Sequence, residues 1–208
     1  MTGSLVLVGG GGHAKVVLTA AVSAGRTIAG FLDDHPDAAL RRLDVACLGS
    51  ISAWSACDEH SQFIPALGDN LTRSTRMLEI LEHCDLRRLA TVIHSTAIVS
   101  PHDVTIGAGT FIGPGAIVNP GARIGIGVII NSGAIVEHDV VVGDWAHIGP
   151  GAALGGAARV ETRALVGLGS CVLLGRTIGH DAIVGAGAVV TRDVVAASTV
   201  RGAPAREW

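Results

Sequence analysis

Residues 106–135 decide the fold, because in blocks of six they read IGAGTF, IGPGAI, VNPGAR, IGIGVI and INSGAI. Every block begins with an aliphatic residue, and the frame continues unbroken to residue 190. The second residue is usually glycine, and the fifth is small or valine at almost every turn. The aliphatic positions are Ile106, Ile112, Val118, Ile124, Ile130, Val136, Val142, Ile148, Leu154, Val160, Val166, Val172, Ile178, Val184 and Val190. A fixed period of six is the signature of a solenoid in which each block forms one short strand and a corner.

Simple sterics turn this period into a prediction of a parallel β-helix. The aliphatic side chain points inward, and glycine lets the chain turn where a Cβ atom would obstruct it. Three blocks would complete a triangular coil, and successive coils stack at about 4.8 Å. We therefore expect an all-β parallel β-helix over residues 91–195, followed by a C-terminal tail at 196–208. Counting backwards from Ile106 in steps of six reaches Ser100 and His94, which are not aliphatic. This predicts a first coil that caps the β-helix and follows the repeat only loosely.

Residues 1–90 follow a different pattern, in which short apolar strands alternate with helices. The predicted strands are 5–8, 27–32, 45–48 and 62–67, and the predicted helices are 14–24, a short one near Ser52, and 71–84. Gly25 would end the first helix, and Asp69 or Asn70 would cap the last. Such alternation indicates a small parallel α/β sheet of Rossmann-like type.

Composition excludes several classes of protein. The net charge is −3, and the 15 basic residues include one lysine and form no basic run, which argues against a nucleic-acid or polybasic membrane surface. The start MTGSLVLVGGGGH lacks a basic segment, and no apolar stretch is long enough to cross a membrane. The four cysteines have no ligand spacing and fit reduced, small hydrophobic residues. We expect a cytoplasmic protein.

A glycine-rich turn opens the first predicted helix. Gly9-x-Gly11-x-x-Ala14 follows a strand, and Asp33 lies 24 residues after Gly9. Backbone amides at a helix N-terminus suit a phosphate group, and Asp33 would reach a ribose hydroxyl. The turn could also carry no ligand, whereas NAD or NADP is disfavoured because the α/β region is too short for the two-mononucleotide fold. A nucleotide-containing ligand that is not a redox cofactor remains the favoured interpretation.

The triplet Glu137-His138-Asp139 interrupts the packed pattern of the β-helix, and His147 follows nine residues after His138. A neutral imidazole paired with a carboxylate has a fixed tautomer and the basicity that a general base requires. The alternative is a histidine that simply lies at a solvent-exposed corner. A zinc site is disfavoured, because His138, His147 and His180 are spaced by 9 and 33 residues and form no close pair.

Taken together, these motifs resemble the hexapeptide-repeat sugar acetyltransferases over nearly the full length. The resemblance is narrower to the bacterial enzymes that acetylate nucleotide-linked 4-amino sugars of the bacillosamine and perosamine type, or sialic acid. It rests on GGGGHAK at 9–15, FLDD at 31–34, ALGDN at 66–70, INSGAIVEHD at 130–139, HIGPGAALGG at 147–156 and GAPAR at 202–206.

The resemblance implies a left-handed β-helix, a nucleotide-sugar-binding domain at 1–90, and a homotrimer with active sites between subunits. It also implies acetyl-CoA as the co-substrate, bound along the β-helix, and no metal. The implied catalytic residues are His138 as general base, Asp139 as its partner and Gly156, whose amide would receive the oxyanion. The implied substrate-binding residues are Gly11, Gly12, His13, Asp33, Asp34, Gly68 and Asn131, and the implied cofactor-binding residues are His147, Gly167 and Ala186.

The resulting expectation is N-acetylation of a nucleotide-linked 4-amino-deoxysugar by direct attack on the thioester. O-acetylation of sialic acid or another sugar hydroxyl is the alternative within the class, and a zinc hydratase or a non-catalytic trimer would be alternatives outside it. Two departures from the family pattern bear on the site. Asp139 stands where the family often has glutamate, and LLGR at 173–176 replaces a Pro-Gly type of corner.

Overall fold

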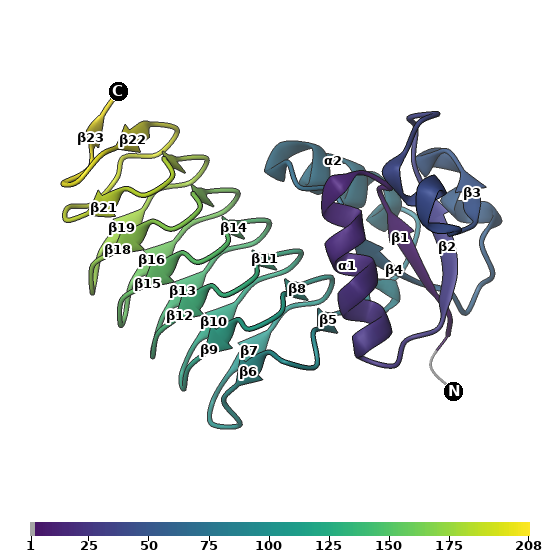
Figure 1. Ribbon diagram of the computed structural model, residues 1–208, viewed down its shortest axis with the longest axis horizontal. Coiled ribbons are helices and arrows are strands. Elements are labelled where there is room, and N and C mark those ends of the chain that lie inside the picture. Colours follow the sequence, from purple (N-terminus) through teal and green to yellow (C-terminus); the bar gives the residue numbers. More distant parts are fainter. Residues whose placement is uncertain (1–2) are drawn as a thin grey trace.

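The computed structural model describes residues 3–208 and contains a small α/β domain joined to a long stack of short strands (Figure 1). The α/β domain consists of β1 (Leu5–Val8), α1 (Gly12–Ser23), β2 (Ile28–Leu32), η1 (Ala39–Leu43), β3 (Cys47–Gly49), η2 (Ile51–Ala56), β4 (Gln62–Pro65), α2 (Asn70–Leu81) and η3 (Leu86–Arg88). Its four strands are parallel in the order β3-β2-β1-β4. The predicted small parallel sheet is therefore confirmed.

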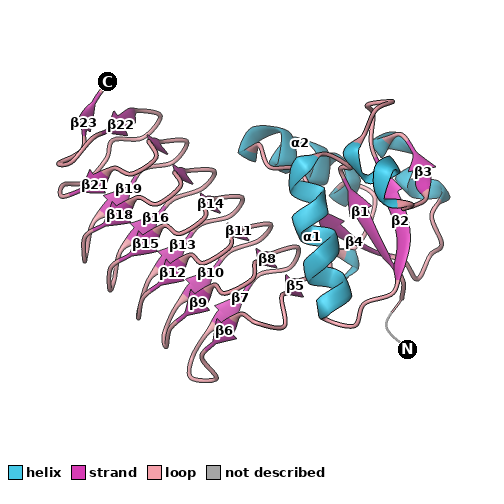
Figure 2. Cartoon of the chain, viewed as in Figure 1, coloured by secondary structure: helices cyan, strands magenta, loops and turns pink. Residues whose placement is uncertain are grey.

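Local sequence explains the ends of the two α-helices. The chain leaves α1 through Gly25, whose φ of +70° is a left-handed value that glycine adopts without strain. At the start of α2, the Asp69 carboxylate accepts a hydrogen bond from the Thr72 amide at 2.8 Å, as an N-cap does. The helix predicted near Ser52 is the short 3-10 segment η2 (Figure 2).

The remaining strands form three sheets, to each of which a full coil adds one strand; all of them are parallel except β23, which pairs antiparallel with β22. The five-strand sheet contains β7 (Thr105–Ile106), β10 (Arg123–Ile124), β13 (Val141–Val142), β16 (Arg159–Val160) and β19 (Thr177–Ile178). The eight-strand sheet contains β5 (Val92–Ile93), β8 (Phe111–Ile112), β11 (Ile129–Ile130), β14 (His147–Ile148), β17 (Leu165–Val166), β20 (Ile183–Val184), β22 (Thr199–Arg201) and β23 (Arg206–Glu207). The six-strand sheet contains β6 (Ile98–Val99), β9 (Ile117–Val118), β12 (Ile135–Val136), β15 (Ala153–Leu154), β18 (Cys171–Val172) and β21 (Val189–Val190). This is a left-handed parallel β-helix, as expected.

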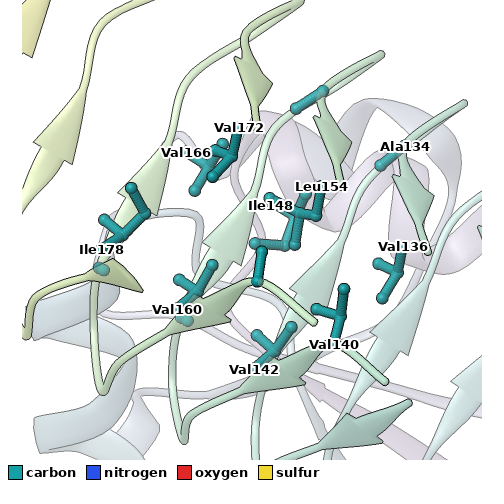
Figure 3. Close-up of a cluster of buried hydrophobic side chains, with 14 of the residues drawn as sticks. Ala134, Val136, Val140, Val142, Ile148, Leu154, Val160, Val166, Val172 and Ile178 are labelled. Atoms are coloured by element: carbon teal, nitrogen blue, oxygen red, sulfur yellow. The ribbon is translucent and has the colours of Figure 1, made fainter. Parts of the chain in front are cut away.

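The interior of the β-helix is the column of aliphatic side chains that the six-residue period predicts. Val136, Ile148 and Leu154 are fully buried, and Figure 3 shows them pointing into the centre of the coil with their neighbours. The alanines at the fifth position of each block, such as Ala146, are buried as well. Alternate large and small residues thus fill a narrow triangular core without voids.

Two sets of glycines shape the corners for different reasons. A Cβ atom on Gly107 would lie 2.5 Å from the backbone of Gly125 in the next coil, so the second position of a block needs glycine for close stacking. The fourth position of a block has a positive φ throughout, for example +71° at Gly109. Five residues other than glycine occupy that strained position: Asp139, Trp145, Ala157, Arg163 and Asp181.

The first coil differs from the in-frame prediction. Ile93 and Val99 pack against the core, and their pairing partners are Ile112 and Val118. The core-facing positions are therefore Ile93 and Val99 rather than His94 and Ser100. The frame shifts by one residue in the corner before Ile106, where Asp103 adopts a φ of 52°. At the other end, β22 pairs in parallel with β20, so the ladder continues past residue 195.

The α/β domain packs on the outer face of the eight-strand sheet. Outward residues there stack in register as Phe111, Ile129, His147, Leu165 and Ile183. Phe111 and Ile129 are buried in one cluster with residues of α1, whereas Ile183 is exposed. His147 therefore lies where the edge of the α/β domain meets the open face. No helix within residues 3–208 is long and apolar enough to cross a membrane.

Candidate active site

His138 lies at the corner that connects the six-strand sheet to the five-strand sheet, here termed the His138 corner (residues 119–122, 137–140 and 155–158). Its Nδ1 atom is 2.9 Å from Oδ2 of Asp139. Because a carboxylate only accepts, Nδ1 carries the proton and the lone pair is on Nε2. Both side chains are more than 60% exposed, at 63% and 69%. Asp139, although shorter than glutamate, therefore reaches the imidazole. The sequence alone had left this question open.

Backbone geometry accounts for aspartate at this place. Asp139 has a φ of 60°, in the left-handed region that asparagine and aspartate enter far more readily than longer side chains do. From that backbone conformation the short carboxylate turns back onto the neighbouring ring.

Gly156 occupies the same corner one coil later. A Cβ atom there would lie 2.6 Å from Nε2 of His138, so only glycine leaves room for the ring. Within residues 3–208 the Gly156 amide has no hydrogen-bond partner. The structure thus brings the three residues predicted to be catalytic together, and the glycine against which the free ring nitrogen packs has a free N–H.

A second group of polar residues lies at the junction of the two domains. Nδ2 of Asn131 is 3.0 Å from Nε2 of His147, and Oδ1 of Asn131 accepts from the Ser132 amide at 2.8 Å. The second bond orients the amide so that its NH₂ group faces His147. His147 consequently accepts at Nε2 and carries its proton on Nδ1.

The histidines at this junction are held neutral. Burial lowers the pKa of His147 to about 4, with a contribution from the Arg73 charge, while the Gly68 backbone opposes the shift. Burial also lowers the pKa of His13 to about 3, assisted by His147 and Arg73. The His13 ring packs edge-on against Phe111, and its Nε2 is buried with no hydrogen-bond partner among residues 3–208. A ligand group that pairs with this nitrogen would remove an unsatisfied polar atom.

The glycine turn is open to solvent. Gly11 and Gly12 are exposed, and nothing lies within 4 Å of a Cβ built on either. No side chain caps the start of α1, so its N-terminal amides face a space that a phosphate could fill.

The two aspartates predicted to hold the nucleotide both bind local backbone. Asp33 accepts from the amides of Gly10 at 2.6 Å and His35 at 2.7 Å. Asp34 accepts from the Ile51 amide at 2.9 Å and forms an ion pair with Arg76 at 3.3 Å. These bonds maintain the shape of the turn and of the loop after β2.

The residues predicted to bind the cofactor, Gly167 and Ala186, are adjacent at one corner of consecutive coils. A Cβ on Gly167 would lie 2.8 Å from the Ala186 amide. Ala186 is exposed, and Gly167 follows directly after the strand that pairs with His147. Near them, a groove of about 440 Å³ is lined by Gly68, Asn70, Leu71, His147, Leu165 and Ile183.

Seven of the predicted site residues therefore form two groups in one chain. His138, Asp139 and Gly156 share one corner, whereas Gly68, His13, Asn131 and His147 lie at the domain junction. Among residues 3–208, no hydrogen bond, ion pair or ring contact joins the two groups. No set of three or more His, Cys, Asp or Glu side chains in this part of the chain is arranged to hold a metal ion.

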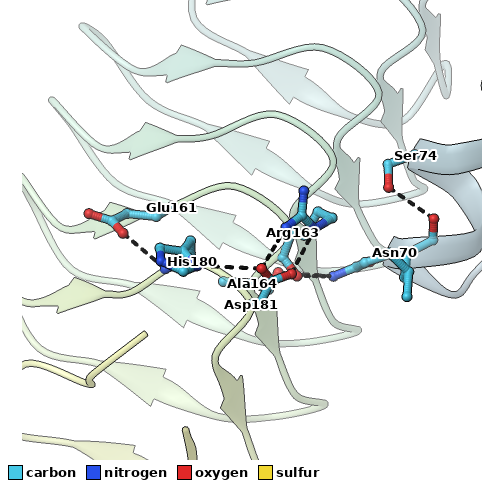
Figure 4. Close-up of polar contacts among 8 residues, drawn as sticks. Asn70, Ser74, Glu161, Arg163, Ala164, His180 and Asp181 are labelled. Atoms are coloured by element: carbon cyan, nitrogen blue, oxygen red, sulfur yellow. Dashed lines mark hydrogen bonds and ion pairs between the residues drawn. The ribbon is translucent and has the colours of Figure 1, made fainter. Parts of the chain in front are cut away.

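Sequence reasoning missed the polar contacts that hold the domains together. Arg73 and Asn70 of α2 bond the backbone of the β-helix, and Figure 4 shows Asn70 reaching the coil that carries Arg163. One signal was present. Arg73 lies four and seven residues before the buried Met77 and Ile80, so it occupies the apolar face of an amphipathic helix.

Known proteins agree with this architecture. Residues 4–80 match the family model of the PglD N-terminal domain, and residues 121–156 match that of the bacterial transferase hexapeptide (six repeats). Perosamine N-acetyltransferase (PerB) from Caulobacter crescentus, solved with CoA and GDP-perosamine, is 37% identical with a TM-score of 0.92 over 100% of this chain and 98% of its own. The chain belongs to the hexapeptide-repeat sugar acetyltransferases.

Two further solved members of the family cover the whole chain. The acetyltransferase domain of PglB from Neisseria gonorrhoeae, in complex with acetyl coenzyme A, is 31% identical with a TM-score of 0.92, and each chain is covered completely. WeeI from Acinetobacter baumannii is 27% identical with a TM-score of 0.87, also over 100% of both chains. No match was found among curated protein sequences. The likeness therefore spans both domains of this acetyltransferase.

Proposed function

We propose that this acetyltransferase transfers the acetyl group of acetyl-CoA to the amino group of a nucleotide-linked 4-amino-deoxysugar. The observation that carries the proposal is the arrangement at the His138 corner, where Nδ1 is bonded to Asp139 at 2.9 Å and Nε2 lies 2.6 Å from where a Cβ on Gly156 would stand, so the base packs against the glycine whose amide is free. A base and an oxyanion donor side by side are what acyl transfer to an amine requires. Full-length similarity to a perosamine N-acetyltransferase supports the choice of acceptor.

The reaction follows from these atoms. The sugar amine attacks the thioester carbonyl carbon, and Nε2 of His138 takes the proton that the nitrogen loses. The Gly156 amide donates a hydrogen bond to the oxyanion that develops. Collapse of the tetrahedral intermediate breaks the C–S bond, and the CoA sulfur leaves with the proton from His138. General-base catalysis typically contributes about 10²–10⁴-fold, and one oxyanion donor about 2.7–4 kcal/mol.

No acyl-enzyme is needed in this scheme. Among residues 3–208, the only side-chain hydrogen bond of His138 is to Asp139, so no serine or cysteine is activated by it.

The acceptor would occupy the domain junction. The open amides at Gly11 and Gly12 suit the diphosphate, and the unpaired Nε2 of His13 offers a hydrogen bond to the sugar or phosphate. The His138 corner does not contact this junction within one chain. We therefore infer a homotrimer in which His138 of one subunit faces the junction of the next, with acetyl-CoA beside His147, Gly167 and Ala186.

The test is release of CoA thiol from acetyl-CoA with a panel of acceptors. GDP-, UDP- and dTDP-linked 4-amino-6-deoxysugars would be compared with the matching 4-hydroxy sugars and with sialic acid. Turnover confined to amino sugars supports the proposal, and turnover on hydroxyl acceptors alone would show O-acetylation instead. Failure with every amino sugar while acetyl-CoA still binds would contradict it. Light scattering gives the mass in solution, and a monomeric active enzyme would contradict the shared site.

A further inference from the structure

Arg73 is the one charged side chain among the fully buried residues of 3–208. No carboxylate forms an ion pair with it in this part of the chain, and its pKa falls to about 10 through burial, opposed by Asp69. It is therefore still a cation at neutral pH. Burying an unpaired charge costs several kcal/mol, so its carbonyl partners must offset that cost. The identity of those partners indicates its role.

One side of the guanidinium bonds the loop after β4. Nη1 donates to the carbonyls of Leu67 and Gly68, both at 3.2 Å. Gly68 belongs to the acceptor side of the candidate site, since a Cβ on it would contact His13 at 3.6 Å and its backbone acts on His147. Arg73 thus holds a loop that borders the junction.

The other side of the guanidinium bonds the β-helix. Nε donates to the Gly127 carbonyl at 3.0 Å, and Nη2 donates to the carbonyls of Trp145 at 2.6 Å and Ala146 at 3.3 Å. Trp145 and Ala146 directly precede His147. The same side chain therefore connects the Gly68 loop to the backbone that enters the strand of His147.

Asn70 extends these contacts by one more coil. Its Nδ2 donates to the carbonyls of Arg163 at 2.8 Å and Ala164 at 3.1 Å, and its Oδ1 accepts from Arg73 at 3.0 Å. Arg163 is itself held by hydrogen bonds to Asp181 of the following coil (Figure 4). Asn70 and Arg73 together contact the equivalent corner of three consecutive coils.

Helix and coil dimensions explain how two residues can do this. Gly127, Trp145 and Arg163 stand one coil apart, and coils stack at about 4.8 Å. Three residues of an α-helix rise about 4.5 Å. Residues 70 and 73 of α2 bond different coils, so a shift of the domain along the β-helix by a fraction of the coil spacing would break these bonds.

We propose that Arg73 and Asn70 are positioning residues that dock the α/β domain at one height on the β-helix and so set the spacing between Gly68 and His147. The proposal rests on the function proposed above, because the acceptor is placed at this junction. Neither residue touches the reacting atoms in this scheme. Their effect on turnover is exerted through the loop and the strand that they hold.

The Arg73 charge adds an effect that a purely mechanical contact would not have. The ionisable groups that face His147 are His13 on α1, Arg73 and Asp69 at the start of α2, and Arg163 and Asp181 on the corners beside the groove. Removing the Arg73 charge raises the pKa of His147 towards its ordinary value. The midpoint of His147 protonation, followed by NMR, should then move to higher pH.

The test compares Arg73→Met, Arg73→Lys and Asn70→Ala in the full-length enzyme with a matched control, Arg88→Met. The Arg88 guanidinium also donates to two backbone carbonyls, those of Ser61 and Asp58, at 3.0 Å each, and it lies over the Phe63 ring. All of these contacts are within the α/β domain. At pH 8, we expect the acceptor KM to rise about tenfold or more in Arg73→Met, since a misplaced reactant is costly. The KM for acetyl-CoA should change less than the KM for the acceptor. Arg73→Lys should rescue part of the loss, and Arg88→Met should lower Tm without changing either KM.

Two outcomes would overturn the proposal. One is an Arg73→Met enzyme with lower Tm but wild-type acceptor KM and wild-type His147 titration, which would make Arg73 purely structural. If Arg73→Met does not fold, the same result for Asn70→Ala would count equally. Hydrogen exchange at residues 66–70 provides a readout that needs no substrate, and it should accelerate in the Arg73 variants but not in Arg88→Met. A wild-type enzyme without turnover would contradict the proposed function, whereas unchanged exchange would contradict the positioning role.

Discussion

The β-helix carries two histidines of opposite character, His138 at an open corner and His147 at a closed junction. The His138 side chain is 63% exposed and pairs with a carboxylate, whereas burial and the Arg73 cation lower the pKa of His147 to about 4. Both imidazole rings are held in the tautomer that carries the proton on Nδ1. Only His138 has a free lone pair on Nε2, because Nε2 of His147 accepts from Asn131. The contrast fits the roles proposed for them, proton transfer at the open corner and neutral hydrogen bonding at the junction.

Other histidines of the β-helix sharpen this contrast. His-Asp occurs three times, at 102–103, 138–139 and 180–181. His180 is 3.4 Å from Asp181, but that carboxylate also binds Arg163. His102 lies at the equivalent of the His138 corner in an earlier coil, yet its ring has no hydrogen bond among residues 3–208. The dipeptide alone therefore does not distinguish His138; what does is its bond to an otherwise unshared carboxylate beside Gly156, whose amide is free.

The largest effect is expected for His138→Ala. Loss of the base should lower kcat by roughly 10²–10⁴-fold, while Tm stays near that of wild type because the side chain is mostly exposed. His102→Ala is the matched control, since it removes an exposed histidine from the same kind of corner. Steady-state rates and a thermal melt measure both effects. Wild-type activity in His138→Ala would eliminate the open corner as the catalytic one.

The periodic part of the sequence predicted its own structure well. Aliphatic residues every six positions are all that a triangular coil needs, so both the strand positions and the core from Ile112 to Val190 are confirmed. The prediction was wrong before Ile106, where one extra residue in a corner shifts the frame to Ile93 and Val99. The corner takes up the extra residue while the strands on either side, β6 and β7, still pair in register with β9 and β10, so periodicity alone does not detect it.

The site was predicted less completely. Residues that depart from the coil pattern, such as the His138 triplet, stand out in a sequence, whereas a contact between α2 and three corners depends on docking that no local pattern encodes. One indicator was available in the fourth position of each block. Glycine dominates there, and the exceptions Asp139, Ala157, Trp145, Arg163 and Asp181 all lie at the His138 corner or at the corner that contacts α2. Strained positions of this kind often accompany functional sites.

An intermediate effect is expected for Gly156→Ala. The added methyl group would lie 2.6 Å from Nε2 of His138, so the ring must move, and kcat should fall roughly 10- to 100-fold. The decisive control is the double variant with His138→Ala. If the methyl group acts by displacing the ring, the double variant should be no slower than His138→Ala alone, because coupled residues are non-additive. Fully multiplicative losses would show that Gly156 acts independently of the base.

The smallest effect concerns stability and tests the closed junction. His147 has an ordinary pKa of 6.5 when exposed and about 4 in the folded protein, so between these values the unfolded chain binds a proton that the folded chain does not. Stability is therefore full above pH 6.5 and falls as the pH decreases towards 4, by about 1.4 kcal/mol per pH unit. His147→Gln cannot take up that proton, so denaturant unfolding at pH 7.5 and 5.5 should show a smaller loss of unfolding free energy for the variant than for wild type.

His13, whose pKa is lowered to about 3, acts in the same direction, and His13→Gln should flatten the pH dependence of stability as well. If both variants lost as much stability as wild type, the junction histidines would not be held neutral by burial and Arg73, and the contrast with His138 would rest on geometry alone.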